Sequence, residues 1–260
     1  MAAYPPLVDT HAHLGDSSFD PDRNEVINRA RDVGVAAIVI MAETLQDSVR
    51  NLALAEQFPC LRPAAGLYPE FADLTETVRV VNFIRGRPES FCAIGEVGLD
   101  FWLAKDEETK ELQQEVFRQF IGLAREFDLP LNVHSRSAGR QAVAMLLANN
   151  ALRVQLHAFD GKYSSALPAV EAGFFFSIPP SVVRSRQKQK LLKHLPLSCL
   201  LVESDSPVLG PVPEKRNEPA NTVAALQAIS DIKNIAYAEA ADVVLENTHK
   251  LYGRKIMNGL

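Results

Sequence analysis

Eight short runs rich in aliphatic residues recur along the chain, and a longer segment with helical periodicity follows each of them. The clearest helical segment spans residues 106–127, where Leu112, Val116 and Phe120 repeat at helical spacing and Glu and Gln occupy the opposite face. Strands that alternate with helices in this way form parallel βα units. The runs are residues 7–13, 36–42, 61–67, 91–97, 131–135, 154–158, 173–178 and 199–203. The pattern predicts an α/β protein, a single-domain TIM-like (β/α) barrel over residues 1–260.

Helix starts and chain length agree with this fold. Several predicted helices open with Ser, Thr or Asp, which cap helix N-termini. The predicted helices begin near Asp22, Leu45, Thr75, Ser137, Ser164, Ser185, Pro219 and Tyr237. An open doubly wound sheet would alternate in the same way, but it carries a Gly-rich phosphate loop after an early strand, and this sequence has none. The barrel is therefore the preferred prediction.

Charge, cysteine content and hydropathy exclude several classes of protein. The net charge of -5 argues against a general DNA-coating role, because a polyanion would meet no global positive field. Cys60, Cys92 and Cys199 show no paired spacing, so neither a disulfide framework nor a Cys-rich zinc module is expected. Residues 1–8 lack a secretory signal pattern, and the longest apolar stretch, residues 33–42, is too short to span a membrane. We predict a cytoplasmic protein, with the nucleus as a second location in a eukaryote, no membrane contact and no obligate protein partner.

Side chains that bind metals lie at the C-terminal ends of the predicted strands. His11 and His13 are two residues apart, so they point to the same side of a strand. Glu96 ends the fourth run, where an inward carboxylate is costly to bury without a partner such as a cation. The full set is His11, His13, Glu96, His134, His157 and Asp205. In a barrel, these strand ends share the rim that carries active sites.

Each of these residues also has a structural interpretation, as a hydrogen-bonded core residue or a helix cap. Their gathering on one rim favours a metal site, whereas His194 and His249 fall on predicted helices and are expected to be structural or exposed. Four imidazoles with two carboxylates suit Zn²⁺, Mn²⁺, Fe²⁺ or Co²⁺ better than Ca²⁺. Six groups exceed the three that one catalytic zinc uses. We predict two divalent ions that share a carboxylate, with Zn²⁺ favoured by ligand type and Mg²⁺ or Mn²⁺ as alternatives.

Five motifs resemble those of the TatD-type deoxyribonucleases, in the same order and over nearly the whole chain. They read DTHAH at residues 9–13, GEVGLD at 95–100, HSR at 134–136, HAFDG at 157–161 and ESDSP at 203–207. Residues 135–140, 177–181 and 216–221 are most similar to the third TatD-domain-containing subfamily of animals.

The resemblance implies a barrel of the metallo-dependent hydrolase superfamily that hydrolyses DNA phosphodiester bonds, often from a 3′ end. It also implies a 3′-5′ exonuclease acting on single-stranded DNA or on 3′ ends. It assigns metal roles to the six residues: His11, His13 and Asp205 to one ion, His134 and His157 to the other, and Glu96 between them. One motif departs from the family, which commonly has a His where this chain reads GLYP at residues 66–69.

The mechanism that follows uses a water activated by the paired cations. Asp205 orients that water or accepts its proton, and Glu96 holds the ions, so these two are the predicted catalytic residues. Arg136 is the predicted side chain that stabilises charge on the phosphate. Tyr68, in place of the missing His, is predicted to donate a hydrogen bond to the substrate.

Three further segments have two interpretations each. The basic residues within 184–193 either guide a phosphate backbone or form a solvated helix face, and the second interpretation is preferred. Phe101 and Trp102 either stack on an unpaired base or pack beneath a loop. Residues 206–221, rich in Pro and charge, form either a surface loop or part of the substrate mouth.

Two rival functions belong to other classes. The first is an amidohydrolase-type enzyme that cleaves C–N or ester bonds in a small molecule, because this architecture suits both chemistries. Many such enzymes bridge their metals with a Lys at the end of the fourth strand, where this chain has Glu96. The second is a binding or scaffold protein without catalysis, but an ordinary structural zinc needs only about four ligands. The deoxyribonuclease is the preferred prediction.

Overall fold

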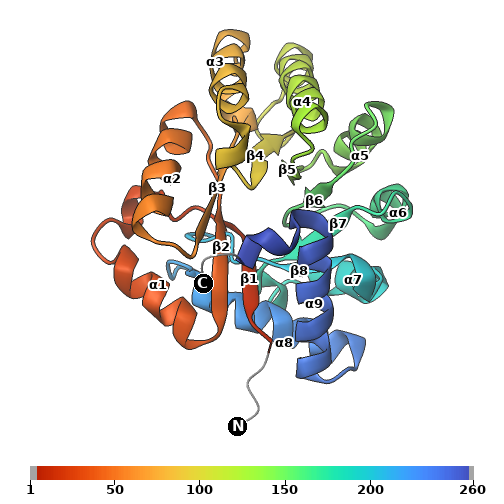
Figure 1. Cartoon of the computed structure of the whole chain (residues 1–260). Helices are drawn as coiled ribbons and strands as arrows, with labels where there is room; N and C mark the ends of the chain where they lie inside the picture. Colours follow the sequence, from red (N-terminus) through yellow and green to blue (C-terminus); the bar gives the residue numbers. More distant parts are fainter. Residues whose placement is uncertain (1–4, 258–260) are drawn as a thin grey trace.

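Eight parallel strands stand side by side in chain order, and the helices lie around them (Figure 1). The computed structural model describes residues 5–257, apart from the side chains of residues 254 and 255. The strands are β1 (Leu7–Ala12), β2 (Val35–Ile40), β3 (Leu61–Ala65), β4 (Ala93–Gly98), β5 (Leu131–His134), β6 (Val154–Leu156), β7 (Phe175–Ile178) and β8 (Leu200–Val202). Each pairs in parallel with the next. The predicted TIM-like α/β barrel is confirmed.

A helix follows each of the first seven strands, and two follow the eighth. The helices are α1 (Arg23–Asp32), α2 (Leu45–Gln57), α3 (Leu74–Arg85), α4 (Glu107–Phe127), α5 (Gly139–Ala148), α6 (Tyr163–Glu171), α7 (Arg186–His194), α8 (Thr222–Lys233) and α9 (Tyr237–Tyr252). Short 3-10 turns cover Ser17–Phe19, Pro69–Phe71, Pro88–Ser90, Pro180–Val183, Leu197–Cys199, Pro219–Asn221 and Arg254–Met257. The helix predicted from Pro219 thus begins as a 3-10 turn. Among the helices of residues 5–257, none is both long and apolar enough to cross a bilayer.

Hydrogen bonds at the ends of β1 and β8 bring the first and last strands together. The backbone N–H of Asp205 donates to the carbonyl of His11 at 2.8 Å, and the N–H of His13 donates to the carbonyl of Ser206 at 2.8 Å. The sheet therefore curls into a nearly closed barrel. This closure places the residues after β8 beside those at the end of β1.

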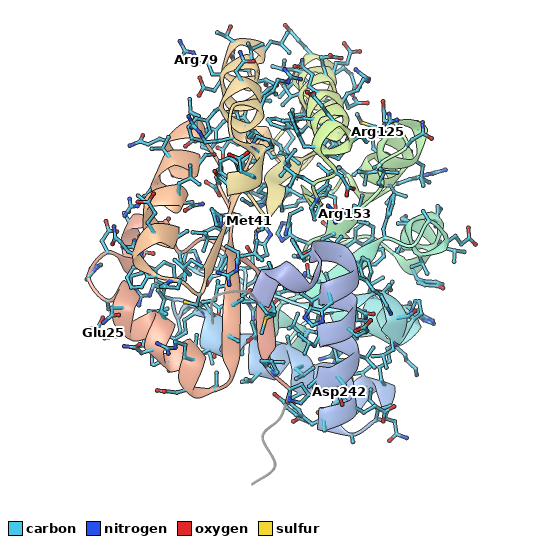
Figure 2. All side chains as sticks on the ribbon, viewed as in Figure 1. Glu25, Met41, Arg79, Arg125, Arg153 and Asp242 are labelled. Carbon is cyan, nitrogen blue, oxygen red and sulfur yellow. The ribbon has the colours of Figure 1, made fainter. Side chains whose placement is uncertain are left out.

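The inside of the barrel is filled by small and medium apolar side chains that meet α9 and the turn after it. In Figure 2, Met41 lies within the ring of strands, whereas Glu25, Arg79 and Asp242 are exposed on the helices. The members of this inner core are Val8, Ala37, Val39, Met41, Ala64, Ala93, Leu201, Leu251, Tyr252 and Ile256. A larger core lies between the strands and the surrounding helices.

Tyr252, at the end of α9, closes the barrel floor with polar contacts. Its hydroxyl donates to Gln155 Oε1 at 2.6 Å and accepts from Asn132 Nδ2 at 3.1 Å. Asn132 and Gln155 are the second residues of β5 and β6, so this contact lies toward the N-terminal ends of the strands. The C-terminal ends remain open for a site.

Candidate metal centre

Glu96 lies between two pairs of histidines. Its carboxylate is almost fully buried, and Oε2 is 3.5 Å from His11 Nε2 and 3.3 Å from His13 Nε2. The other oxygen, Oε1, is 2.8 Å from His134 Nδ1 and 2.9 Å from His157 Nε2. One carboxylate therefore faces both pairs, with one oxygen toward each.

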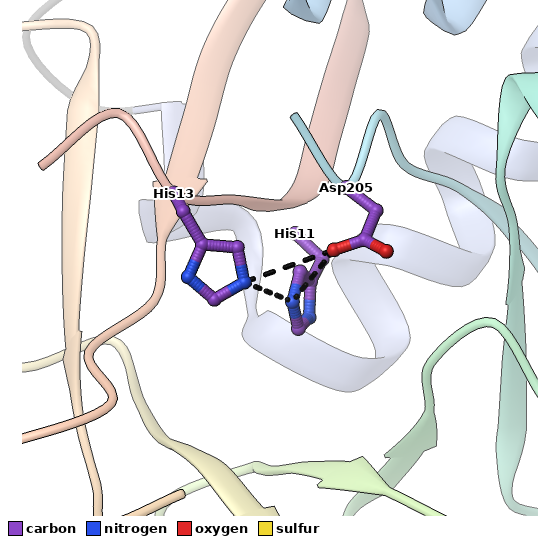
Figure 3. Close-up of side chains that lie close together, drawn as sticks. All are labelled: His11, His13 and Asp205. Carbon is purple, nitrogen blue, oxygen red and sulfur yellow. Dashed lines mark hydrogen bonds and ion pairs between the residues drawn. The ribbon is translucent and has the colours of Figure 1, made fainter. Parts of the chain in front are cut away.

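Asp205 completes the first pair, as Figure 3 shows. Its Oδ1 is 3.5 Å from His11 Nε2 and 3.7 Å from His13 Nε2, and the two Nε2 atoms are 3.1 Å apart. The structure thus brings together all six side chains predicted from the strand ends. They converge at the C-terminal mouth of the barrel.

Local backbone geometry turns Asp205 toward the histidines. The residue follows β8 with a positive φ of 54°, a left-handed conformation that a residue with a β-carbon adopts only at a cost of about 1–3 kcal/mol. Its N–H is bonded to the carbonyl of His11, and its carbonyl accepts from the N–H of Val208 at 2.9 Å. Ser137 and Ala158, in the loops after β5 and β6, also have positive φ values, of 56° and 41°. Such conformations cluster at functional sites, because the surrounding structure must hold them.

Several of these side chains can act as ligands of one ion. Within the part of the chain that the structure describes, three groups have ligand atoms within 4.8 Å of one another: His11, His13 and Asp205; His11, Glu96 and His157; and His13, Glu43 and Glu96. Glu43, directly beyond β2, was not predicted. Its Oε1 lies 3.9 Å from His13 Nδ1, and its side chain is 42% exposed. Only its position after a strand could have indicated it.

The donor set fits divalent cations. Within each histidine pair two ring nitrogens approach to 3.1 Å, and each pair faces an oxygen of Glu96. A proton between the two ring nitrogens of a pair can form only one hydrogen bond. A divalent cation could instead bind both ring nitrogens and the Glu96 oxygen that faces them. Imidazole with carboxylate is the ligand combination of zinc and related transition metals.

Asp100 supports the second pair and was not predicted as a site residue. His134 Nε2 donates to Asp100 Oδ2 at 3.0 Å, and the Tyr68 hydroxyl donates to the same oxygen at 3.2 Å. A histidine that binds metal through one nitrogen commonly donates the other to a carboxylate. The signal was present in the sequence, because Asp100 ends the motif that contains Glu96.

Two other buried polar residues, Asn132 and Glu203, lie beside His11 and His157. Asn132 Oδ1 lies 2.8 Å from His11 Nδ1 and fixes that ring. Glu203 Oε2 lies 3.8 Å from His157 Nδ1, while the same oxygen accepts from Ser177 Oγ at 2.5 Å. His157 Nδ1 itself is buried without a hydrogen bond.

The pKa values of three histidines indicate which rings of the cluster favour a proton. They are raised at His11 and His134 and lowered at His157. Burial alone would lower the pKa of His11, but the hydrogen bond and charge of Glu96 outweigh it and raise the pKa to about 10. Burial is likewise outweighed at His134, where the hydrogen bonds of Asp100 and Glu96 raise the pKa to about 9. At His157 burial prevails, together with the charge of His11, and lowers the pKa to about 4. Positive charge is therefore favoured at Glu96, which agrees with a cation site.

A cavity of about 570 Å³ opens over the cluster. Its wall includes Pro207, Val208 and Leu209 from the segment after β8. The first part of residues 206–221 therefore lines the cavity, and its role in a substrate mouth stays a prediction. Asn217 anchors the rest, because its Nδ2 donates to the carbonyl of Ser204 at 2.6 Å.

Both predicted substrate-binding residues, Tyr68 and Arg136, line this cavity. The guanidinium carbon of Arg136 lies 3.7 Å from the ring centroid of Trp102, and its Nε lies 3.8 Å from Asp100 Oδ2. Trp102 is 54% exposed, whereas Phe101 packs against the core. The packing interpretation thus holds for Phe101, and Trp102 forms a support for Arg136 at the rim.

The other histidines and most of the basic run lie outside the cluster. His194 is exposed on α7, and His249 is half-buried on α9, as predicted. The exposed members of the run are Arg184, Arg186, Lys190 and Lys193. Lys188 differs, because it is half-buried and lines the cavity.

Comparison with known proteins gives a consistent result at the level of sequence. Residues 8–253 match the family model described as TatD related DNase. The human protein named deoxyribonuclease TATDN3 is 42% identical over 261 residues, which cover 95% of this chain and 94% of that protein. A Bacillus subtilis protein named as an uncharacterized metal-dependent hydrolase, YabD, is 33% identical over 254 residues, which cover 95% of this chain and 98% of that protein.

Comparison with solved structures agrees with the sequence matches to the TatD family. The crystal structure of YjjV, a TatD homologue from Escherichia coli K12, superimposes on this chain with a TM-score of 0.87 and 28% sequence identity. The match covers 95% of this chain and 97% of the other.

Proposed function

The chain belongs to the TatD-related DNase family, and we propose that it is a metal-dependent deoxyribonuclease that hydrolyses phosphodiester bonds of DNA. The observation that carries the proposal is the buried carboxylate of Glu96, which faces a histidine pair with each oxygen at the floor of an open cavity. Fold alone would suit C–N hydrolysis equally well, but family membership favours the phosphodiester.

The proposed centre holds two divalent ions. His11, His13 and Asp205 would hold one ion and His134 and His157 would hold the other, with the Glu96 carboxylate between the two sets of residues. Ligand type favours Zn²⁺, with Mg²⁺ and Mn²⁺ as alternatives. When bound, such ions supply a water of lowered pKa and Lewis acidity toward a phosphate oxygen.

Residues of the chain carry the remaining steps. Asp205, which faces the first histidine pair, orients the attacking water and accepts its proton. Arg136, held against Trp102 at the cavity wall, balances the charge that grows on the phosphate. Tyr68 lines the same wall beside His134 and is the second proposed substrate contact.

The cavity size favours a strand end or an unpaired segment as the substrate. At about 570 Å³ it has the volume of a small-molecule site, which takes one or two nucleotides more readily than an intact duplex. Because the family resemblance implies action from a 3′ end, we propose 3′-5′ exonuclease action on single-stranded DNA or on 3′ ends.

The test uses a single-stranded oligonucleotide labelled at its 5′ end, with protein stripped of metal and reloaded with Zn²⁺, Mn²⁺ or Mg²⁺. We expect a ladder of products shortened from the 3′ end, and a loss of rate of about a hundredfold or more in Glu96→Gln, because the charge between the histidine pairs is removed. Glu111→Gln, an exposed change on α4, is the matched control. Internal cuts would contradict the exonuclease, and cleavage of amide or lactone substrates instead of DNA would favour the rival hydrolase.

A further inference from the structure

The charged side chains in the wall of the cavity are mostly acidic, and the cationic ones among the described residues are Arg136 and Lys188. The acidic members are Asp16, Glu43, Asp47, Glu96, Asp160 and Asp205. A phosphate that enters this cavity meets carboxylates on several sides. Fixed positive groups are therefore needed near the path of the substrate, beyond the ions of the proposed centre.

Lys188 is a cation with open hydrogen-bond donors. It lies in the first turn of α7, it is half-buried, and its Nζ donates to the carbonyl of Ala158 at 3.1 Å. Within residues 5–257, no carboxylate lies within ion-pair distance of its Nζ. Surface cations behave differently: the Arg29 guanidinium lies 2.6 Å from Glu218. The ammonium of Lys188 thus keeps donors free toward the cavity.

The position of Lys188 is fixed relative to the metal cluster. Ala158, whose carbonyl holds the ammonium, directly follows His157. Burial lowers the pKa of Lys188, whereas the charge of Glu203 raises it, so the ammonium is held in a place where its charge is costly. An anionic ligand would offset this cost, because a buried charge is stabilised by a partner of opposite sign.

We infer that Lys188 binds a phosphate group of the substrate strand and lies on the other side of β6 from Arg136. The inference rests on the proposed function. Arg136 follows β5 and Lys188 follows β7, so the two cations flank β6, the strand that leads to His157. The exposed basic residues of the same run do not line the cavity and are solvated.

The first experiment compares Lys188→Gln with Lys190→Gln, an exposed change two residues further along α7. On a single-stranded oligonucleotide, we expect the KM of Lys188→Gln to rise about tenfold, the effect of one lost hydrogen bond to a charged group. The slope of log kcat/KM against log salt concentration should become shallower by about 0.7, the contribution of one phosphate contact on a single strand. Lys188→Arg should keep the wild-type slope, and equal melting temperatures check the fold of each variant.

A second substrate distinguishes which phosphate is bound. Bis(p-nitrophenyl) phosphate contains one phosphodiester and no neighbouring phosphate. A loss in Lys188→Gln on both substrates places Lys188 on the scissile phosphate, and a loss on the oligonucleotide alone places it on a neighbouring one. Equal behaviour of Lys188→Gln and Lys190→Gln on both substrates overturns the inference.

Failure of the proposed function would be visible separately. If the wild-type protein cleaves neither substrate with any metal, the nuclease is wrong irrespective of Lys188. Fluorescence anisotropy of a labelled oligonucleotide then decides the inference alone, because equal affinity of the wild type and Lys188→Gln would refute phosphate binding by Lys188.

Discussion

At the scale of single residues, Asp100 fixes the outer side of the second histidine pair. Its Oδ1 accepts from the backbone N–H groups of Trp102 and Leu103 at 2.9 and 3.0 Å, so the carboxylate cannot rotate freely. Burial raises the pKa of Asp100, but the hydrogen bonds from His134 and Leu103 together with the charges of His134 and Arg136 outweigh it, and the pKa lies below its ordinary value. The ionised carboxylate accepts a hydrogen bond from the N–H of His134 Nε2, while Nδ1 is directed at Glu96.

This geometry predicts that Asp100→Asn weakens metal binding. The amide removes the negative charge that holds the Nε2 proton of His134, and we expect an affinity loss of about 10- to 100-fold. Titration of the metal-free protein against a competing chelator measures the affinity. Asp242→Asn, on the exposed face of α9, is the control. Wild-type affinity in Asp100→Asn would show that the carboxylate does not orient His134.

The sequence could predict which side chains share the rim but not how they are supported. Alternation along a strand puts His11 and His13 on one side, and strand order puts the other predicted residues at the same end of the barrel. The partner of His11, however, is Asn132, 121 positions away. This contact forms because the two side chains meet in the barrel interior. The spacing of residues along the sequence cannot predict it. The assignment of the six residues to two ions stays a prediction.

At the scale of secondary-structure elements, the close approach of β4 and β5 depends on Gly98. Its φ is +142°, and a β-carbon at this position would lie 2.0 Å from the carbonyl oxygen of His134. Gly122 on α4 is different, because a β-carbon there meets nothing within 4 Å. The two glycines therefore form a matched pair, one required by packing and one replaceable.

We predict opposite effects of alanine at the two positions. Gly98→Ala should lower the free energy of unfolding by about 1–3 kcal/mol, because the backbone around His134 must shift. Gly122→Ala should raise it by about 0.5–1 kcal/mol, because alanine favours a helix over glycine. Urea unfolding measures both. If Gly98→Ala had the same free energy of unfolding as the wild type, β4 and β5 could move apart at this contact without loss of stability.

Helix starts show where element prediction succeeds and fails. The helix predicted near Leu45 begins there, because Thr44 and Asp47 form a capping box within the same turn. The helix predicted near Ser137 begins at Gly139 instead. Ser137 has a φ of 56°, and its N–H donates to Asp160 Oδ2 at 2.9 Å. A hydrogen-bond partner 23 positions away thus overrides the local preference of Ser137 for a helix start. The pattern of neighbouring residues does not reveal such a distant partner.

At the scale of the whole molecule, the proposed ligands come from the ends of β1, β4, β5, β6 and β8. The cluster therefore exists only while the barrel is closed. An ion bound there binds the folded state and not the unfolded chain, so it stabilises the entire fold.

Removal of metal should consequently lower the melting temperature. Free metal at about 100 times its Kd adds about 2.7 kcal/mol for each bound ion, and a protein of this size shifts by about 2–4 °C per kcal/mol, so we expect a drop of about 5–10 °C for each ion removed by the chelator. Differential scanning calorimetry with and without chelator measures it. In Glu96→Gln, the melting temperatures with and without chelator should differ much less than in the wild type. A wild-type melting temperature that chelator leaves unchanged would argue against a resident ion.

The difference between the melting temperatures with and without chelator should become smaller as the pH is lowered. In the metal-free fold the pKa values of His11 and His134 are raised to about 10 and about 9. Their contribution to stability is fully present below the ordinary value of 6.5 and is lost as pH rises through the raised values. Protons thus compete with metal at neutral and lower pH. The calorimetric difference at about pH 6 should be smaller than that at about pH 8.

The closure of β1 against the residues after β8 has a consequence for protein synthesis. A ribosome delivers His11 well before Asp205, and the two become neighbours only after the segment between them has emerged. An incomplete copy left by interrupted translation lacks one side of the cluster. If the full chain cuts DNA as proposed, a product that ends before Asp205 is expected to lack that activity.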